Sequence, residues 1–155
     1  MGRLYEELED ENGTVTKYRR HSNGRGLVAP TARVDESAYI EASAWVEPEA
    51  HVGRDCWVGA GSWIDRGSRL GDRTFIGANV HIGSGTILGA GVRVGSHTKI
   101  GDNAVVAPGT RVERDIVVAG GAKLGRFERS RLDGAGEFAA REAPAASSRL
   151  GRKAA

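Results

Sequence analysis

The sequence is short of the residues that hold most small folds together. It has a single cysteine, Cys56, which excludes an internal disulfide framework and is typical of a reducing compartment. It has only three Trp, three Tyr and three Phe, and no apolar run long enough to span a bilayer. Its first residues, Met-Gly-Arg, are followed at once by acidic residues, unlike a secretory signal. We therefore expect a cytoplasmic protein of one domain, with no membrane partner.

Neither sign of charge dominates the chain. It carries 22 Lys and Arg against 20 Asp and Glu, a net charge of +2, and has no basic stripe with interleaved aromatic residues. This balance gives no reason to expect a nucleic-acid partner. What the chain has in excess is glycine, with 23 residues, which together with the few aromatics predicts a turn-dense repeat rather than a mixed globular core.

A repeat of six residues runs through most of the sequence. Seventeen consecutive positions at this spacing hold Val, Ile or Leu, and the residue after each of them is Gly, Ala, Asp or Glu. The aliphatic positions are Val28, Val34, Ile40, Val46, Val52, Val58, Ile64, Leu70, Ile76, Ile82, Leu88, Val94, Ile100, Val106, Val112, Val118 and Leu124. The fourth residue after each aliphatic is nearly always small, with Ile116 and Glu128 as late exceptions, and Glu128 indicates that the repeat has ended.

A period of six fits neither a lone helix nor a simple alternating strand. It predicts a short strand and a turn, repeated so that three units form one eighteen-residue coil. The aliphatic side chain then points inward and the small residue fills the corner beside it. We expect glycine in these turns because it tolerates backbone angles that other residues do not. Successive coils pair as a parallel ladder with a rise of about 4.8 Å.

The repeat resembles that of the hexapeptide-repeat superfamily, whose pattern is an aliphatic residue, then Gly, Ala, Glu or Asp, two free positions, a small residue and a free one. The resemblance covers about two-thirds of the chain. The prediction that the coil is left-handed comes from this resemblance. It implies an all-β fold, a single-stranded left-handed parallel β-helix of about five to six coils. The superfamily includes acyltransferases, γ-class carbonic anhydrases, sugar-nucleotide enzymes and non-catalytic subunits, so the fold does not settle the activity.

Segments at both ends lie outside the repeat, which we place at residues 27–127. In residues 1–26 an acidic run meets a turn signal at Asn12-Gly13, and Thr14 to Tyr18 has the pattern of a strand. We expect a hairpin or strand there that caps the open first coil. Residues 128–155 are rich in Ala, Arg, Ser and Glu, and we expect a disordered or partly helical tail.

Aromatic residues gather in two exterior columns, because residues eighteen apart stack on adjacent coils. Trp45 and Trp63 share one column, and Tyr39, Trp57 and Phe75 share the other. These columns could stiffen the coils by aromatic stacking, or the N-terminal segment could cover them. The alternative is that they form a protein interface, which we favour because exposed apolar surface usually marks one. Related proteins are trimers with parallel axes, so the resemblance implies a homotrimer that buries these stripes.

One polar column is the candidate catalytic site. Asn79, His97 and Asp115 share a register three residues after the inward aliphatic, so Asp115 could hold His97 in one tautomer and leave its other nitrogen as a general base. His81 follows close after Asn79 at the same corner. The structural alternative is a set of surface side chains in a polar ladder.

Two further stretches resemble hexapeptide acyltransferases. The stretch from Ile100 to Thr110 is similar to their closing coils, and Val117 to Arg126 is similar to their terminal Val-x-Gly-x-Pro-Ala-Lys segment, which contacts coenzyme A (CoA) in many members. By that match Lys123 and Arg126 would meet the CoA phosphates. The sequence departs from the family in having Gly121 in place of the Pro and no catalytic loop, and Ser84 stands where some members carry their catalytic His.

The resemblance therefore implies an acyltransferase that moves an acetyl or acyl group from a CoA thioester to a hydroxyl or amine of a small-molecule acceptor, with a His base at a subunit interface. A non-catalytic trimeric scaffold is the alternative, because loops usually carry function on such frameworks and this chain has none. A γ-carbonic-anhydrase-like metal protein is the third reading. We expect no metal, since the offsets of His51, His81 and His97 do not match that family's ligands.

Overall fold

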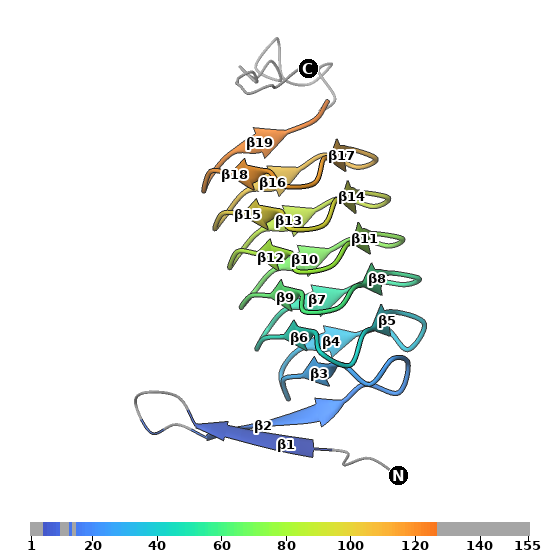
Figure 1. The fold of residues 1–155 in the computed structure, drawn as a ribbon, viewed down its shortest axis with the longest axis vertical. Coiled ribbons are helices and arrows are strands. Elements are labelled where there is room, and N and C mark those ends of the chain that lie inside the picture. Colours follow the sequence, from blue (N-terminus) through green and yellow to red (C-terminus); the bar gives the residue numbers. More distant parts are fainter. Residues whose placement is uncertain (1–4, 10–12, 14, 127–155) are drawn as a thin grey trace.

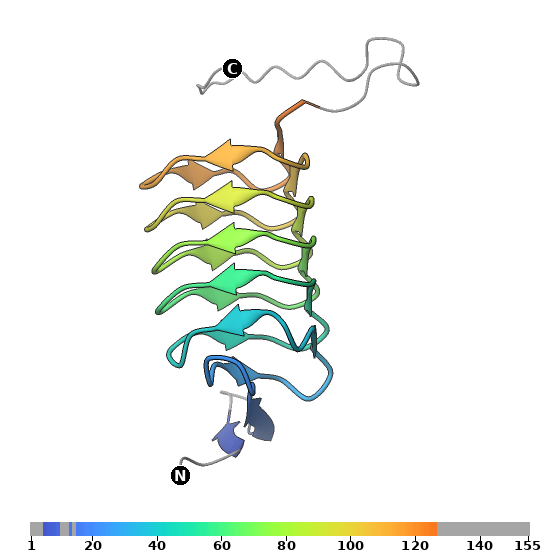
Figure 2. The same cartoon turned by 90° about the vertical axis from the view of Figure 1, so that its right-hand side faces the viewer.

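The computed structural model describes residues 5–9, 13 and 15–126 and shows a three-sided prism of stacked coils (Figure 1). It confirms the all-β, left-handed parallel β-helix, with seventeen two-residue strands from β3 to β19 and eighteen residues between strands that pair. The coils lie directly above one another with their edges aligned (Figure 2). The predicted end of the repeat at Phe127 and the predicted tail, residues 128–155, lie outside the described residues.

The strands form three parallel faces. The first face holds β3 (Leu27–Val28), β6 (Trp45–Val46), β9 (Trp63–Ile64), β12 (His81–Ile82), β15 (Lys99–Ile100) and β18 (Val117–Val118). The second face holds β4 (Arg33–Val34), β7 (His51–Val52), β10 (Arg69–Leu70), β13 (Ile87–Leu88), β16 (Val105–Val106) and β19 (Lys123–Leu124). The third face holds β5 (Tyr39–Ile40), β8 (Trp57–Val58), β11 (Phe75–Ile76), β14 (Arg93–Val94) and β17 (Arg111–Val112).

The core is the predicted aliphatic column. All of its members are buried except Val34, on the first coil, and Leu124, on the last described coil, which are partly exposed. The small residues of the corners are buried beside it, and several are hydroxyls. Each buried hydroxyl has a backbone carbonyl partner, as when Ser62 Oγ donates to Gly77 O at 2.6 Å. These bonds make a polar corner compatible with a dry core, because a buried hydroxyl is costly only when it lacks a partner.

At the position after the inward aliphatic, glycine has a different role from the one that we expected. None of the eight from Gly53 to Gly101 at that position has a positive φ. They are needed because the next coil passes too close for a side chain: a Cβ on Gly71 would lie 2.6 Å from the Ala90 nitrogen. The left-handed turns lie two residues further on, where glycine alternates with Asn, Asp, Arg and His.

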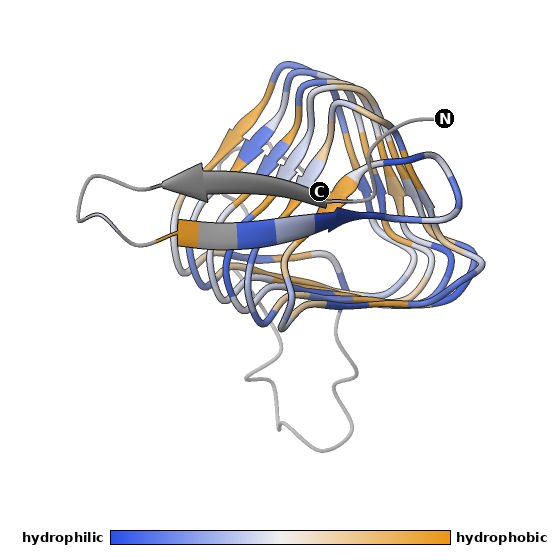
Figure 3. Cartoon of the chain, turned by 90° about the horizontal axis from the view of Figure 1, so that it is seen from below, coloured by the Kyte–Doolittle hydropathy of each residue, from blue (hydrophilic) through white to orange (hydrophobic). Residues whose placement is uncertain are grey.

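An antiparallel hairpin continues the first face below the first coil. Strands β1 (Tyr5–Glu9) and β2 (Val15–Arg20) pair with each other, and β2 pairs antiparallel with β3. Strand β2 crosses the lower end of the prism in the view from below (Figure 3). Tyr18 and His21 are 7% and 2% exposed, so the hairpin is packed onto the coils rather than hanging free. Within the described ranges there is no helix that could cross a membrane.

Candidate functional site

The predicted polar column exists as a column, but its side chains are not bonded to one another. Asn79, His97 and Asp115 are exposed turn residues with φ of 57°, 62° and 60°. Asn, Asp and His are the non-glycine residues that best tolerate this left-handed region, so turn geometry accounts for their presence. Across residues 15–126 no side-chain hydrogen bond joins the three, and the Asp115 carboxylate lies 3.7 Å from Arg114 Nε instead.

His81 has the acidic partner that His97 lacks. Its Nε2 lies 3.2 Å from Asp65 Oδ2, and the two side chains are 28% and 27% exposed. The imidazole also stacks on the Trp63 ring, with 4.6 Å between centroids and 17° between planes. Because a carboxylate only accepts, Nε2 carries a proton and Nδ1 is the nitrogen free to act as a base. The ring is held on two sides and remains accessible.

The same surface continues toward the hairpin through Glu47. Its carboxylate accepts from Trp63 Nε1 at 2.6 Å and from the Tyr18 hydroxyl at 2.7 Å. Tyr18 packs edge-on against Trp45, with centroids 5.2 Å apart. Burial, and then the hydrogen bond to Glu47, raise the pKa of the Tyr18 phenol well above its ordinary value. The hairpin therefore helps to fix Glu47 and, through Glu47, the Trp63 ring on which His81 stacks.

Sequence reasoning missed Asp65 because it compared residues eighteen apart. The Asp65–His81 and Glu47–Trp63 contacts both join residues sixteen apart. In each, the carboxylate lies two residues after the first residue of a strand and contacts the residue that pairs with that first residue on the next coil. A comparison at that offset would have listed both pairs as candidates, without showing that their side chains meet.

The aromatic column of the third face is stacked. Tyr39 and Trp57 have centroids 4.1 Å apart, Trp57 and Phe75 6.4 Å, and the Arg93 guanidinium lies 4.9 Å from the centre of the Phe75 ring. Trp57 remains 45% exposed, as does Trp63 at 43% on the first face. Trp45, in contrast, is partly covered by Tyr18. Stacking and hairpin cover are thus both present, and burial of these columns in a homotrimer remains a prediction.

The residues expected to meet CoA phosphates lie away from His81. Lys123 and Arg126 are exposed, with Lys123 in β19 of the second face, whereas His81 is in β12 of the first face. Within one chain they do not converge. Among the described residues no three His, Cys, Asp or Glu side chains gather as a metal site requires; His51 is on the second face and His97 at a corner.

The family follows from a match that spans most of the β-helix. Residues 23–124 match the GMPPB C-terminal domain. The chain belongs to this family. No curated protein sequence matches it.

Solved structures of acetyltransferases share the fold. A variant of GDP-perosamine N-acetyltransferase from Caulobacter crescentus, in complex with CoA and GDP-perosamine, is 29% identical over 64% of this chain and 47% of its own, with a TM-score of 0.62. The acetyltransferase domain of PglB from Neisseria gonorrhoeae is 26% identical over 64% of this chain and 48% of its own, with a TM-score of 0.62. The matched region spans about half the length of these structures.

Proposed function

We propose that this β-helix is an acyltransferase-like module that transfers an acetyl or acyl group from a CoA thioester to an amine or hydroxyl. The observation that carries the proposal is the His81–Asp65 pair, with Nε2 and Oδ2 3.2 Å apart on a partly exposed face. The likeness to acetyltransferases whose structures hold CoA supports the choice of donor. The other ligand named there, GDP-perosamine, makes a sugar nucleotide the first acceptor class to test.

His81 is the proposed general base. Asp65 holds Nε2–H, so Nδ1 takes the proton from the acceptor's amine or hydroxyl as that atom attacks the thioester carbonyl. The bond from the carbonyl carbon to sulfur then breaks, and CoA leaves as the thiol after taking up a proton. Asp65 stabilises the imidazolium that forms, as the carboxylate of a catalytic triad does. His97, with Asn79 and Asp115 on the same corner, is the second candidate for the base.

Lys123 and Arg126 are proposed to bind the CoA phosphates. Because Lys123 lies on a different face from His81, one site that uses both must lie between two copies of the chain. This requirement agrees with a homotrimer packed through the aromatic columns, in which Trp57 and Trp63 supply exposed apolar surface.

The first test is binding and turnover by the full chain. We expect calorimetric binding of acetyl-CoA, and release of free thiol when an amino-sugar nucleotide is added. His81→Asn should lower kcat by about 10²–10⁴-fold, while Asp65→Asn lowers kcat and shifts the pH-rate profile. His97→Asn decides between the histidines: loss of turnover there, with His81→Asn unaffected, moves the base to His97. No binding at millimolar acetyl-CoA by a folded chain refutes the acyl-transfer proposal.

The second candidate function is a non-catalytic scaffold. The uninterrupted eighteen-residue pairing from β3 to β19 favours it, because catalytic residues on regular frameworks usually lie on inserted loops. A scaffold predicts an oligomer by analytical ultracentrifugation that is weakened by Trp57→Ala, together with no CoA binding.

A further inference from the structure

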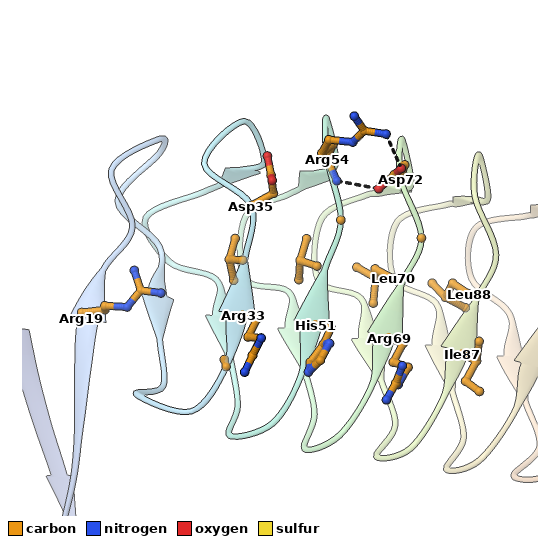
Figure 4. Close-up of a pocket in the computed structure, with 15 residues that line it drawn as sticks. Arg19, Arg33, Asp35, His51, Arg54, Arg69, Leu70, Asp72, Ile87 and Leu88 are labelled. Carbon is orange, nitrogen blue, oxygen red and sulfur yellow. Dashed lines mark hydrogen bonds and ion pairs between the residues drawn. The ribbon is translucent and has the colours of Figure 1, made fainter.

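A shallow groove along the second face is lined by arginines and His51, together with the carboxylates of Asp35 and Asp72. Arg33, His51 and Arg69 occupy adjacent rungs of β4, β7 and β10, with direct pairing of Arg33 to His51 and of His51 to Arg69. Their side chains extend in a row from the same side of the three strands, and Arg19 of β2 lies beyond Arg33 (Figure 4). Ile87 follows Arg69 on the next rung, so the cationic row is short and has an apolar end.

The two arginines of the row have no carboxylate partner in the part of the chain that the structure describes. Other arginines do: Arg54 is 3.2 Å from Asp72, and Arg66 is 3.7 Å from Glu49. Arg33 and Arg69 are exposed and contact no acidic side chain. Within the described residues, no ion pair therefore neutralises the charge of Arg33 or Arg69.

The nearby carboxylates are already occupied. Asp72 accepts from both the backbone and the side chain of Arg54, and these bonds lower the pKa of the Asp72 carboxyl. Asp35 accepts from the backbone and the hydroxyl of Ser37, which lowers the pKa of the Asp35 carboxyl. The Asp72 carboxylate is thus paired with Arg54, whereas the donors to Asp35 are neutral, so the Asp35 charge offsets only part of the positive charge of the row.

The two arginines of the row repel each other only weakly. They lie on either side of His51, two rungs and roughly 9–10 Å apart between backbones. A bound anion removes this repulsion, and arginine is well suited to hold phosphoryl oxygens through paired N–H donors.

We propose that the row of Arg33, His51 and Arg69 is a binding site for a diphosphate group. Arg33 and Arg69 lie two rungs apart, or roughly 9–10 Å between backbones, and His51 lies between them. Two linked phosphoryl groups along the strand-to-strand direction meet one arginine each and share the imidazole. Arg19 adds a third arginine at the open end, whereas Ile87 suits an apolar or planar part of the ligand.

The diphosphate has two possible sources, a nucleoside diphosphate and CoA. Both carry the same linked phosphoryl groups, so the site chemistry is shared. The proposal does not rest on the proposed acyl transfer, because it uses neither His81 nor Asp65 and its readout is binding rather than turnover.

The test titrates the full chain with inorganic pyrophosphate, GDP and CoA, followed by calorimetry and by amide chemical shifts at about 0.15 M salt. We expect saturable pyrophosphate binding with shifts centred on β4, β7 and β10. Arg33→Gln and Arg69→Gln should each weaken binding by about tenfold, and Arg69→Lys by less, since one charge-assisted pair is lost or kept. Arg111→Gln is the matched control, because it removes the same charge from a ladder position on the third face.

Each outcome decides the proposal. Tighter binding of GDP than of pyrophosphate, lost in the two glutamine variants, assigns a nucleotide; the same pattern for CoA assigns the acyl donor. Equal weakening by Arg111→Gln means a diffuse charge effect and overturns the site. So does the absence of pyrophosphate binding, or a salt-sensitive self-association that Arg69→Gln abolishes, which would instead assign the row to a second copy of the chain.

Discussion

Gly83→Ala tests whether close approach of the coils explains the glycine column. Gly83 has no positive φ, so alanine introduces no backbone strain of that kind. Its Cβ, however, would lie 2.6 Å from the nitrogen and carboxylate of Asp102 and from the carbonyl carbon of Gly101. Two of these three atoms belong to the backbone, which cannot rotate away as a side chain can.

The cost can be worked out from the hydrogen bonds on either side. Reaching ordinary contact requires a local separation of roughly 0.8 Å, the difference between 2.6 and 3.4 Å. The bonds from Gly83 N to Ile100 O and from Asn103 N to Ser84 O are both 2.8 Å, and such a separation breaks them. Two bonds of about 0.5–1.5 kcal/mol give about 1–3 kcal/mol. Alanine offsets part of this by stiffening the unfolded chain, by about 0.4–1 kcal/mol, so the central values of about 2 and about 0.7 kcal/mol leave an expected net loss of about 1.3 kcal/mol.

Urea unfolding followed by far-UV circular dichroism measures this loss. Gly109→Asn is the matched control, because Gly109 has φ of +75° and open space around it, and Asp55 and Arg73 adopt the same conformation at equivalent turns. The control should change the free energy of unfolding by less than about 0.5 kcal/mol. If Gly83→Ala is as neutral as Gly109→Asn, close approach is not the reason for the glycine column.

Three further predictions concern buried polar groups. Burial lowers the pKa of His21 below the ordinary histidine value of 6.5, so the unfolded chain binds the proton first and the free energy of unfolding falls as pH drops below about 6.5; a urea titration series between pH 8 and 5 should show this fall, and His21→Gln should reduce it. Tyr18→Phe removes the 2.7 Å bond to Glu47 and should cost about 1 kcal/mol by urea unfolding, so an unchanged midpoint would rule out a stabilising role for that bond. Ser62→Ala leaves Gly77 O and Val80 N without their shared partner and should cost about 1–3 kcal/mol, seen as a lower thermal midpoint; an unchanged midpoint would show that the corner hydroxyl is dispensable.

The sequence predicted the fold because one simple constraint acts on every coil. A prism of constant cross-section needs an inward aliphatic at every sixth residue, and a single column such as Val46, Ile64, Ile82 and Ile100 fixes both the face and the rung. Rung partners therefore followed from spacing alone, and the pairing of Trp45 with Trp63 across β6 and β9 is an example.

Contacts between different positions of the repeat did not follow in the same way. Whether His81 meets Asp65 depends on how a side chain leans at the end of a two-residue strand, which periodicity does not encode. The reverse error arose for His97 and Asp115, since sharing a register places two residues on one corner without aiming their side chains at each other.

The eighteen-residue register separates the chemistry of the three faces. The first face carries the His81 pair, the second the Arg33–His51–Arg69 row, and the third the Tyr39–Trp57–Phe75 stack. Because a side chain on one flat face cannot reach across an edge to the middle of another, any reaction that needs two of these chemistries must use the faces of two copies. The proposed acetyl transfer and the predicted oligomer should therefore be lost together on dilution or in Trp57→Ala, whereas pyrophosphate binding to the Arg33–His51–Arg69 row, which needs only one copy of the chain, should survive in the monomer.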